Sequence, residues 1–509
     1  MRYPQSTSSG PVRRGISLIY IGLQGMFTSC ALLLAGITAA QAANDIFAHT
    51  QACHIEGIDE KVRCGSVTVA ENPDKPDGRQ IDVHYVVLPA IKNADPDKAL
   101  LAIAGGPGQS AIENAAYFNQ MLGKVRQFRD ILLIDQRGTG LSQPLACEDM
   151  TPINALAYND ENLDMPALTQ ACLQQQQADV TQYGSLSAVR DFEAVRQAAG
   201  YSKLDIYGIS YGTRMAQVYL KHYPQVLTTV TLDGVVPMQQ NLMYISEAIA
   251  RATDLMLTDC EQNAACQQAF PQLRSQLAEV EQQLAQQPVS AKVNDPMSGE
   301  VSELLLTRSK FLGAIRMALY SPTTRSLLPY AINQAAAGNY QPILGLYGLT
   351  TDGAGIAMGM HASVVCGEDI PFVDDTVEQV ANRTFVGSEM LSSLREVCSV
   401  WQVPPVDPSF HQPVNSDVPV LLLSGEMDPA TPPSWAELAM VDLRNATHLI
   451  SPYAGHGVAS QTCANGLIAT LVKTGSLKEQ DASCLDRDIS RSFYLNANTV
   501  EPLATANKE

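Results

Sequence analysis

The sequence is poor in positive charge and lacks the motifs of several common binding sites. Of its 509 residues, 33 are Lys or Arg and 52 are Asp or Glu, which gives a formal net charge of −19. Because nucleic-acid binding needs clustered Lys and Arg, this balance argues against a nucleic acid as a partner. No CxxC pair and no HExxH motif occurs, so neither common type of zinc site is indicated. We therefore expect no metal and no other cofactor.

Long repetitive or disordered segments are also missing. With 46% apolar and 17% charged residues, 34 Gly and 29 Pro, the composition is that of a globular protein with a sizeable core. The chain is longer than one ordinary domain of about 100–200 residues. We expect a large core together with an insertion or a second domain.

One long apolar run lies at the N-terminus. Three arginines precede a mostly apolar segment at residues 16–39, which is followed by Ala-Gln-Ala. This pattern is typical of a secretory signal peptide over residues 1–42, which leaves Ala43 as the new N-terminus. The alternatives are an uncleaved membrane anchor and, more weakly, a lipid anchor at Cys30. We expect export, to the periplasm or the medium, with no stable membrane association after cleavage.

Export changes the interpretation of the cysteines, because an oxidising compartment lets thiols pair. Removal of the leader takes one of the 11 cysteines and leaves ten. Spacing does not fix their connectivity, and the simplest arrangement pairs neighbours along the chain. Each bridge would close a short loop and contribute about 2–4 kcal/mol to stability. The pairs predicted in this way are Cys53–Cys64, Cys147–Cys172, Cys260–Cys266, Cys366–Cys398 and Cys463–Cys484.

Short apolar runs alternate with helical periodicities in two parts of the chain. Apolar residues alternate over residues 81–87, which predicts an antiparallel edge strand. Continuous apolar runs occur at residues 99–104, 131–134, 204–207, 229–232 and 418–423. Runs of this length, separated by helical patterns such as residues 189–199 and 215–222, are typical of parallel strands that helices cover on both faces. The sequence therefore predicts an α/β fold with a mostly parallel central sheet and right-handed crossovers.

The alternation stops after residue 234. Apolar residues then recur at helical spacing, as at residues 273–284, and no buried-strand run is found before residue 418. We expect an inserted, mainly helical cap at residues 238–413. It would separate a first core segment at residues 43–237 from a second at residues 414–509.

Residues 204–212 read LDIYGISYG, an apolar strand followed by a GxSxG turn. A helix is predicted to begin near Thr213. Glycines on both sides of Ser210 let the chain turn so tightly that the hydroxyl stands clear above the sheet, an arrangement known as the nucleophile elbow. Bulk at Gly208 or Gly212 would clash. The alternative is an ordinary glycine turn between a strand and a loop.

A serine hydroxyl needs a base, and the base needs a third group to orient it. Chain order in folds with such an elbow is Ser, acid, His, so the partners should follow the last strands. His456, in the flexible AGHG loop, is the predicted base, and His448, in a predicted strand, is the alternative. Asp428, in a proline-containing loop just after a strand, is the predicted acid, with Glu426 as the alternative.

The developing oxyanion needs preorganised hydrogen-bond donors. One predicted donor is the backbone N–H of Tyr211, directly after the nucleophile. The other comes from the GGPG segment that begins at Gly105, where missing side chains let the backbone approach a bound carbonyl. Gly106 is the predicted donor and Gly105 the near alternative. We expect Asp135 and Arg137 to form an internal ion pair that braces this loop.

Five segments together resemble the α/β-hydrolase family of prolyl aminopeptidases and, more closely, secreted tripeptidyl aminopeptidase-like proteins. They are GGPGQS at 105–110, DQRGTGLS at 135–142, YGISYGTR at 207–214, SGEMDPATP at 424–432 and GHG at 455–457. The resemblance implies an α/β-hydrolase fold and a serine peptidase acting at a free peptide N-terminus, with Ser210, Asp428 and His456 as its triad.

The sequence departs from the prolyl aminopeptidase pattern at two positions. Ala104 stands before GGPG, where those enzymes often carry His, and Thr213 follows the elbow, where a second glycine is usual. Both differences fit the tripeptidyl-like branch better. Some members of that branch act on esters or small amides, so the resemblance does not fix the substrate.

An enzyme acting at a free N-terminus must bind an ammonium group, which requires carboxylate partners. Glu368 and Asp369 are the candidates, because a bridge at Cys366 would hold them in place; an ordinary acidic turn is the alternative.

The cap should restrict entry to short peptides, which are the expected substrates. A carboxylesterase with the same triad is the second hypothesis, and a non-catalytic binding protein on the same scaffold is the third. Nothing in the sequence indicates the oligomeric state.

Overall fold

One unit, Ile46–Glu509, contains every residue that the structure describes. The computed structural model describes residues 49–147, 159–294, 299, 301–351, 355–478, 480–487 and 492–500. The predicted leader at residues 1–42, including Cys30, and the expected N-terminus at Ala43 lie outside these ranges. Within them, no helix combines the length and the hydropathy needed to span a bilayer.

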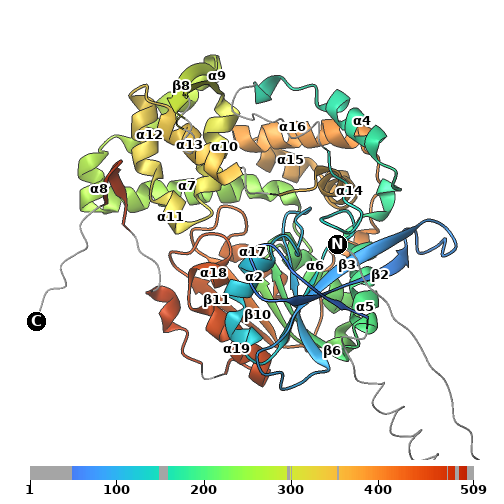
Figure 1. Cartoon of the computed structure of the whole chain (residues 1–509). Helices are drawn as coiled ribbons and strands as arrows, with labels where there is room; N and C mark the ends of the chain where they lie inside the picture. Colours follow the sequence, from blue (N-terminus) through green and yellow to red (C-terminus); the bar gives the residue numbers. More distant parts are fainter. Residues whose placement is uncertain are drawn as a thin grey trace, which may run out of the picture. The chain divides into compact units, whose positions relative to one another are not determined.

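A nine-stranded, mostly parallel sheet lies at the centre of this unit (Figure 1). In spatial order its strands are β1 (Gln51–Cys53), β2 (Val62–Ala70), β3 (Gln80–Leu88), β5 (Asp130–Ile134), β4 (Lys98–Ile103), β6 (Lys203–Ile209), β7 (Leu227–Asp233), β10 (Val420–Gly425) and β11 (Ala446–Ser451). The pairings from β1 to β5 are antiparallel, and those from β5 to β11 are parallel. The predicted α/β fold with a mostly parallel sheet is confirmed.

The strand β3 is antiparallel, as predicted, but it is not at the edge of the sheet. It pairs with β5 on one side and with β2 on the other, and β1 lies beyond β2. The prediction of an edge strand is therefore wrong. Most side chains of β2 are only partly buried or exposed, so its sequence VRCGSVTVA lacks the clear apolar alternation that identified β3.

Successive side chains of the buried strands enter two apolar cores on opposite faces of the sheet. In β4, Leu101 and Ile103 contribute to one core, and Leu100 and Ala102 contribute to the other. The α-helices outside the region between β7 and β10 are α2 (Ala115–Met121), α3 (Gly123–Arg126), α4 (Met165–Gln175), α5 (Ser185–Ala198), α6 (Tyr211–His222), α17 (Pro433–Ala439), α18 (Val458–Gln461) and α19 (Ala464–Thr474). The first core contains residues of α5, α6 and α17, and the second contains residues of α2, α3 and α19. Helices thus cover both faces.

The chain between β7 and β10 is mainly helical. We call residues 238–413 the cap, with the boundaries expected from the sequence. Its α-helices are α7 (Ile245–Gln262), α8 (Ala264–Ala269), α9 (Leu273–Gln286), α10 (Arg308–Ala318), α11 (Pro322–Arg325), α12 (Leu328–Ala336), α13 (Gln341–Thr351), α14 (Met358–Glu368), α15 (Asp375–Ala381) and α16 (Phe385–Val400). Apolar residues of α7, α9, α10, α12 and α13 form a core of their own, and Figure 1 shows several of these helices side by side.

The cap also contains a β-hairpin that the sequence did not predict. Its antiparallel strands are β8 (Val289–Asn294) and β9 (Val301–Leu306). Leu304 and Leu306 of β9 pack into the cap core. A second small pair, β12 (Tyr494–Asn496) with β13 (Thr499–Val500), lies near the end of the chain. The remaining short helices are 3₁₀ turns: η2 (Asp160–Asn162), η3 (Val180–Gln182), η4 (Pro224–Val226), η5 (Leu242–Tyr244), η6 (Ile370–Phe372), η7 (Pro408–His411) and η8 (Ser483–Asp486).

Five disulfide bridges connect residues that are near neighbours in sequence. They are Cys53–Cys64, Cys147–Cys172, Cys260–Cys266, Cys366–Cys398 and Cys463–Cys484. These are the pairs predicted from the order of the cysteines. The bridge from Cys366 to Cys398 joins α14 to α16 and so fixes the end of α14 within the cap.

Candidate active site

Ser210 occupies the turn between β6 and α6. Its backbone has φ 57° and ψ −126°, a conformation that non-glycine residues rarely adopt and that is concentrated at functional sites. A Cβ at Gly208 would lie 2.3 Å from the Gly212 carbonyl oxygen, and one at Gly212 would lie 2.5 Å from that of Ile103. Only glycine fits these two positions, as the elbow motif requires. The helix begins at Tyr211, slightly earlier than predicted.

The predicted acid and base are in direct contact. Asp428 follows β10, His456 follows β11, and His456 Nδ1 lies 2.8 Å from Asp428 Oδ2. Asp428 is fully buried, and its Oδ1 accepts hydrogen bonds from the backbone N–H groups of Ala430 at 2.7 Å and Thr431 at 2.9 Å. The Thr431 hydroxyl also donates to Asp428 Oδ2, at 2.8 Å. With its proton held on Nδ1, the imidazole has Nε2 available as a base.

The surroundings of His456 favour its protonated form. Burial alone would lower the pKa of this imidazole, but the charge of Asp428 and the hydrogen bond to it outweigh burial, so the net pKa is raised. The backbone N–H of His456 donates to the carbonyl oxygen of Tyr320 in the cap, and the Tyr320 ring packs edge-on against the imidazole at 5.0 Å between centroids. The cap therefore helps to fix the orientation of the histidine.

The alternative acid and base lie in other environments. Glu426 forms an ion pair with Arg251 of α7, and its side chain is 39% exposed. His448 Nε2 lies 2.9 Å from the hydroxyl of Ser424, and burial lowers the pKa of this ring. Neither has the contact that joins Asp428 to the imidazole.

Asp233, at the end of β7, links the histidine loop to the elbow. Its two carboxylate oxygens accept hydrogen bonds from the backbone N–H of Val458 at 2.7 Å and of Ala459 at 2.9 Å. The hydroxyl of Tyr207 donates to it as well, at 2.8 Å, and the Ser210 N–H donates to its backbone oxygen at 3.0 Å. Sequence analysis missed this role. One feature of the sequence could have indicated it: Asp233 is a charged residue at the end of an apolar strand, and this end lies at the same edge of the sheet as the serine.

Within the described residues, the Ser210 hydroxyl and the His456 ring are not hydrogen-bonded to each other. The two segments are nevertheless adjacent, because a Cβ at Gly457 would lie 3.0 Å from Cδ1 of Ile209, the residue before the serine. Catalytic hydrogen bonds are often long in substrate-free enzymes and shorten when substrate binds.

The glycine-rich segment approaches the nucleophile closely. A Cβ at Gly105 would lie 3.1 Å from Cβ of Ser210, so a larger residue there would press on the serine. Gly106, Ser210 and Tyr211 line the same cavity. The two predicted oxyanion donors are thus on the walls of one cavity, beside the serine.

Asp135 supports this segment, but not through the predicted ion pair. It accepts hydrogen bonds from the hydroxyl of Ser110 at 2.6 Å and from the backbone N–H of Ile112 at 3.0 Å. Arg137 instead binds Asp191 of α5 through two hydrogen bonds of 2.6 and 2.7 Å. The prediction that Asp135 pairs with Arg137 is therefore wrong, because a carboxylate on α5 takes the guanidinium.

The cap contacts the glycine-rich segment from the other side. His361 Nδ1 on α14 lies 3.2 Å from the Pro107 carbonyl oxygen, and the Ala357 N–H donates to that of Gly108 at 3.0 Å. Burial lowers the pKa of His361, which favours the neutral ring. Core and cap thus both position this part of the site.

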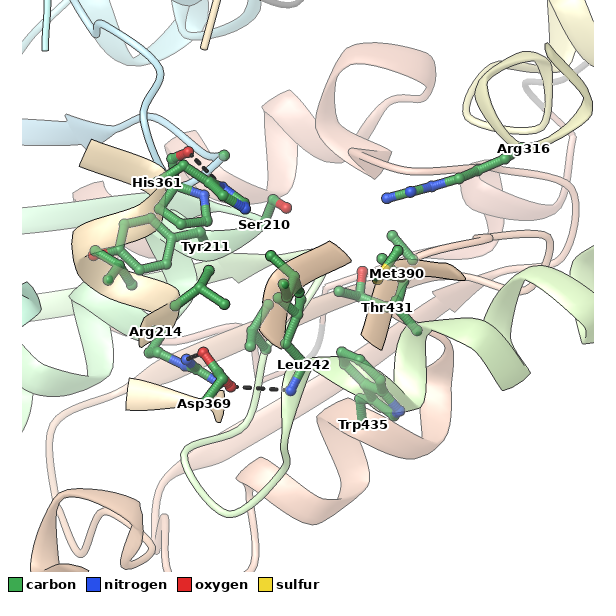
Figure 2. A pocket seen from close by; sticks show the side chains of 18 of the residues that line it. Ser210, Tyr211, Arg214, Leu242, Arg316, His361, Asp369, Met390, Thr431 and Trp435 are labelled. Atoms are coloured by element: carbon green, nitrogen blue, oxygen red, sulfur yellow. Dashed lines mark hydrogen bonds and ion pairs between the residues drawn. The ribbon is translucent and has the colours of Figure 1, made fainter. Parts of the chain in front are cut away.

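A cavity of about 200 Å³ opens beside Ser210 (Figure 2). Its walls are mostly apolar and come from both the core and the cap, as Leu242, Met390 and Trp435 illustrate. Charged groups are few. Arg214 and Asp369 lie together on one side, and Figure 2 shows the Arg316 side chain reaching into the space from the opposite side.

The two carboxylates predicted to bind an ammonium group both lie near Arg214, whose Nη1 is 4.0 Å from Glu368 Oε2 and 2.8 Å from Asp369 Oδ2, but only one of them faces the cavity. Glu368 is not part of the cavity wall; it accepts hydrogen bonds from the Ser185 N–H at 2.7 Å and hydroxyl at 2.8 Å, and burial raises its pKa to about 7. Asp369 does line the cavity, where it binds Arg214 at 2.8 and 3.2 Å and accepts from the Leu242 N–H at 3.0 Å. Glu368 is the last residue of α14 and Asp369 caps it, so their side chains point to different sides.

Sequence analysis also missed the cap residues in the cavity. His361 and Arg316 lie on α14 and α10, and neither belongs to a recognisable motif. In the part of the chain that the structure describes, no group of three or more His, Cys, Asp or Glu side chains could hold a metal ion.

Comparison with known proteins gives two family matches and several relatives. The family described as alpha/beta hydrolase fold matches residues 98–302, and the family described as TAP-like protein matches residues 383–484. The serine protease Hip1 of Mycobacterium tuberculosis (strain H37Rv) is 26% identical over 427 residues, which cover 75% of this chain and 78% of Hip1. The tripeptidyl aminopeptidase of Streptomyces coelicolor is 23% identical over 484 residues and 88% of each chain.

A relative named for a different activity covers a similar share of this chain. Carboxylesterase B of Mycobacterium tuberculosis (strain CDC 1551) is 25% identical over 406 residues, which cover 73% of this chain and 76% of the relative. The two family matches together include Ser210, Asp428 and His456.

Proposed function

Because this chain belongs to the α/β-hydrolase superfamily, we propose that it is a serine peptidase, and specifically an aminopeptidase that cleaves short peptides from their free N-terminus. Ser210 is the nucleophile, His456 the general base and acid, and Asp428 the group that orients the imidazole. The observation that carries this proposal is the 2.8 Å contact between His456 and a buried Asp428, at the same edge of the sheet as a strained serine.

The reaction proceeds in two steps. Nε2 of His456 takes the proton of the Ser210 hydroxyl as the oxygen attacks the carbonyl carbon, and the imidazolium then gives that proton to the leaving amine. Water, deprotonated by the same imidazole, splits the acyl-enzyme and frees the serine. The negative oxygen of each tetrahedral intermediate is stabilised by the backbone N–H groups of Tyr211 and Gly106. The N–H of Tyr211 is available because the first N–H groups of a helix have no partner within it.

The cavity supports small substrates with a free N-terminus. Its volume of about 200 Å³ is below the 300–1,000 Å³ or so that is typical of ligand pockets, so few residues fit at once. Asp369 is the carboxylate on its wall, and we assign it as the partner of the substrate ammonium. The tripeptidyl aminopeptidase and Hip1 relatives support a peptide substrate.

We also propose that the protein is exported, with residues 1–42 as a cleaved leader. Five disulfide bridges support an oxidising compartment, since such bridges are rare where thiols are kept reduced.

The test compares one fluorogenic peptide amide with a free or an acetylated N-terminus. An aminopeptidase should lose at least about a hundredfold in kcat/KM on acetylation, because the charged partner of Asp369 is removed. Asp369→Asn should reduce this discrimination, whereas the matched control Glu368→Gln, outside the cavity, should keep it. Equal cleavage of both peptides would exclude an aminopeptidase.

A carboxylesterase is the second candidate, favoured by the carboxylesterase B relative. It would cleave short acyl esters faster than any peptide amide, with no effect of an amino group on the acyl side. The same purified protein and the same kcat/KM measurement separate the two candidates.

A further inference from the structure

Arg316 is a cation in the cavity that has no anionic partner among the residues that the structure describes. It lies in the last turn of α10, and its side chain extends toward the open space between Ser210 and Met390 (Figure 2). Its Nε is buried, and among the described residues no hydrogen bond or ion pair is formed by its guanidinium. Arg214, the other arginine of the cavity, is bound to Asp369 through two hydrogen bonds. The free charge in the cavity is therefore positive, in a protein whose net charge is −19.

Arg316 lies on the same side of the cavity as His456, the proposed base. Tyr320, four residues further along the chain, accepts a hydrogen bond from the His456 N–H and packs against the imidazole. Burial lowers the pKa of His456 most, Asp428 raises it, and the charge of Arg316 adds a smaller lowering, so the guanidinium acts on the ring electrostatically. Because the imidazolium gives its proton to the leaving amine, this is the side on which the leaving part of the substrate lies.

The opposite side of the cavity carries a carboxylate, that of Asp369, which is paired with Arg214. Asp369 and Arg214 lie beyond Tyr211, whose N–H is the proposed oxyanion donor. Under the proposed function this is the acyl side, where the substrate ammonium binds. With Asp369 assigned to the substrate ammonium, the two ends of the cavity match a molecule with a cation on one side of the cleaved bond and an anion on the other.

We propose that Arg316 binds a carboxylate on the leaving side of the scissile bond, so that the preferred substrates are short peptides whose leaving part carries a carboxylate close to that bond. This inference rests on the proposed aminopeptidase function. A guanidinium in an apolar cavity is costly without a partner, and a substrate carboxylate supplies one through two parallel hydrogen bonds. Arg316 is a specificity residue in this account, and it takes no part in the proton transfers.

The test compares two forms of one short peptide, one that ends in a free carboxylate and one that ends in an amide. The wild-type protein should cleave the free acid at least about tenfold faster in kcat/KM than the amide. Arg316→Gln should bring this ratio close to one, and Arg316→Lys should retain part of it. The matched control is Arg383→Gln, which removes an exposed cap arginine paired with Glu247, and it should keep the wild-type ratio.

Two sources of the carboxylate are distinguished by a second pair of peptides. A longer peptide amide with Asp as its first leaving residue is compared with the same peptide carrying Asn. Preference for Asp assigns the site to an acidic side chain, and preference confined to the free acid of the shortest peptide assigns it to the C-terminus. No preference in either pair, or an unchanged ratio in Arg316→Gln, would overturn the inference.

A failure of this inference about Arg316 can be told apart from a failure of the proposed aminopeptidase function. If acetylation of the N-terminus has no effect, the aminopeptidase assignment fails, whatever the carboxylate ratios are. Fluorophosphonate labelling and thermal unfolding of Arg316→Gln show whether this variant is folded with a reactive serine, so that a lost ratio is not a lost fold.

Discussion

The sheet and the cap contribute to the site in different ways. The sheet provides Ser210, Asp428 and His456, each in the turn or loop that follows a parallel strand and each in a motif. The cap provides Asp369, which follows the last residue of α14, and Arg316 of α10, and neither lies in a motif. The strand ends place the three residues, and the cap adds contacts that orient them, since Tyr320 accepts a hydrogen bond from the His456 N–H and Ala357 donates one to the Gly108 carbonyl oxygen. The difference teaches that the groups proposed for the chemistry stand at strand ends, whereas the charged groups proposed to select the substrate come from the cap.

The largest expected effects come from the strand-end residues. Replacing His456 by Ala or Asp428 by Asn should lower kcat/KM by at least about 10⁴-fold, because the serine then lacks an oriented base. The matched controls are the alternative residues, His448→Ala and Glu426→Gln, which should stay within a few-fold of wild type. A large loss in a control, with little loss in its partner, would reverse the assignment.

The second largest effect is on the free energy of unfolding, through the ion pair that joins the cap to the core. Arg214 of α6 is buried and binds Asp369 at the end of α14. Arg214→Met would leave a buried carboxylate without its partner and should lower the free energy of unfolding by about 3–5 kcal/mol.

The exposed ion pair of Arg383 with Glu247 provides the control, and Arg383→Gln should cost no more than about 1 kcal/mol. Denaturant unfolding measures both. Similar small losses would show that the contact between Arg214 and Asp369 does not hold the two parts together.

A smaller effect concerns the pH dependence of stability. Burial raises the pKa of Glu368 to about 7, so the folded protein keeps this proton between about pH 4.5 and 7, where the unfolded chain releases it. The wild type should therefore lose stability as pH rises through this window, by about 3 kcal/mol relative to Glu368→Gln. Thermal unfolding of both proteins from pH 4.5 to 8 measures the difference, and parallel curves would contradict it.

The smallest effect is a displacement of the pH profile. The net pKa of His456 is raised, and only the neutral ring can accept the serine proton. The acid limb of kcat/KM should therefore lie above the ordinary imidazole value of about 6.5. A limb centred clearly below that value would show that Asp428 does not stabilise the imidazolium.

The same division explains what the sequence could predict. The parallel strands and the elbow at Ser210 follow from local patterns, since apolar runs and glycine turns act within a few residues, whereas Asp428 and His456 were predicted from the chain order of folds with such an elbow. The interior position of β3 could not be predicted, because it depends on pairing with a strand of weak pattern.

Side-chain partners distant in sequence were the least predictable features. Arg137 binds Asp191 rather than Asp135, and the carboxylate of Asp233 reaches backbone N–H groups more than 200 residues away. Glu368 turns from the cavity although its neighbour Asp369 faces it. Each outcome depends on which helix or loop happens to pack nearby, and no local pattern records that.

The most direct test of the central claim is the site of covalent labelling by a fluorophosphonate, mapped by mass spectrometry on the intact, folded protein. The account predicts one adduct, on Ser210, and its loss in His456→Ala. An adduct on another residue, or a folded protein that stays unlabelled, would contradict it.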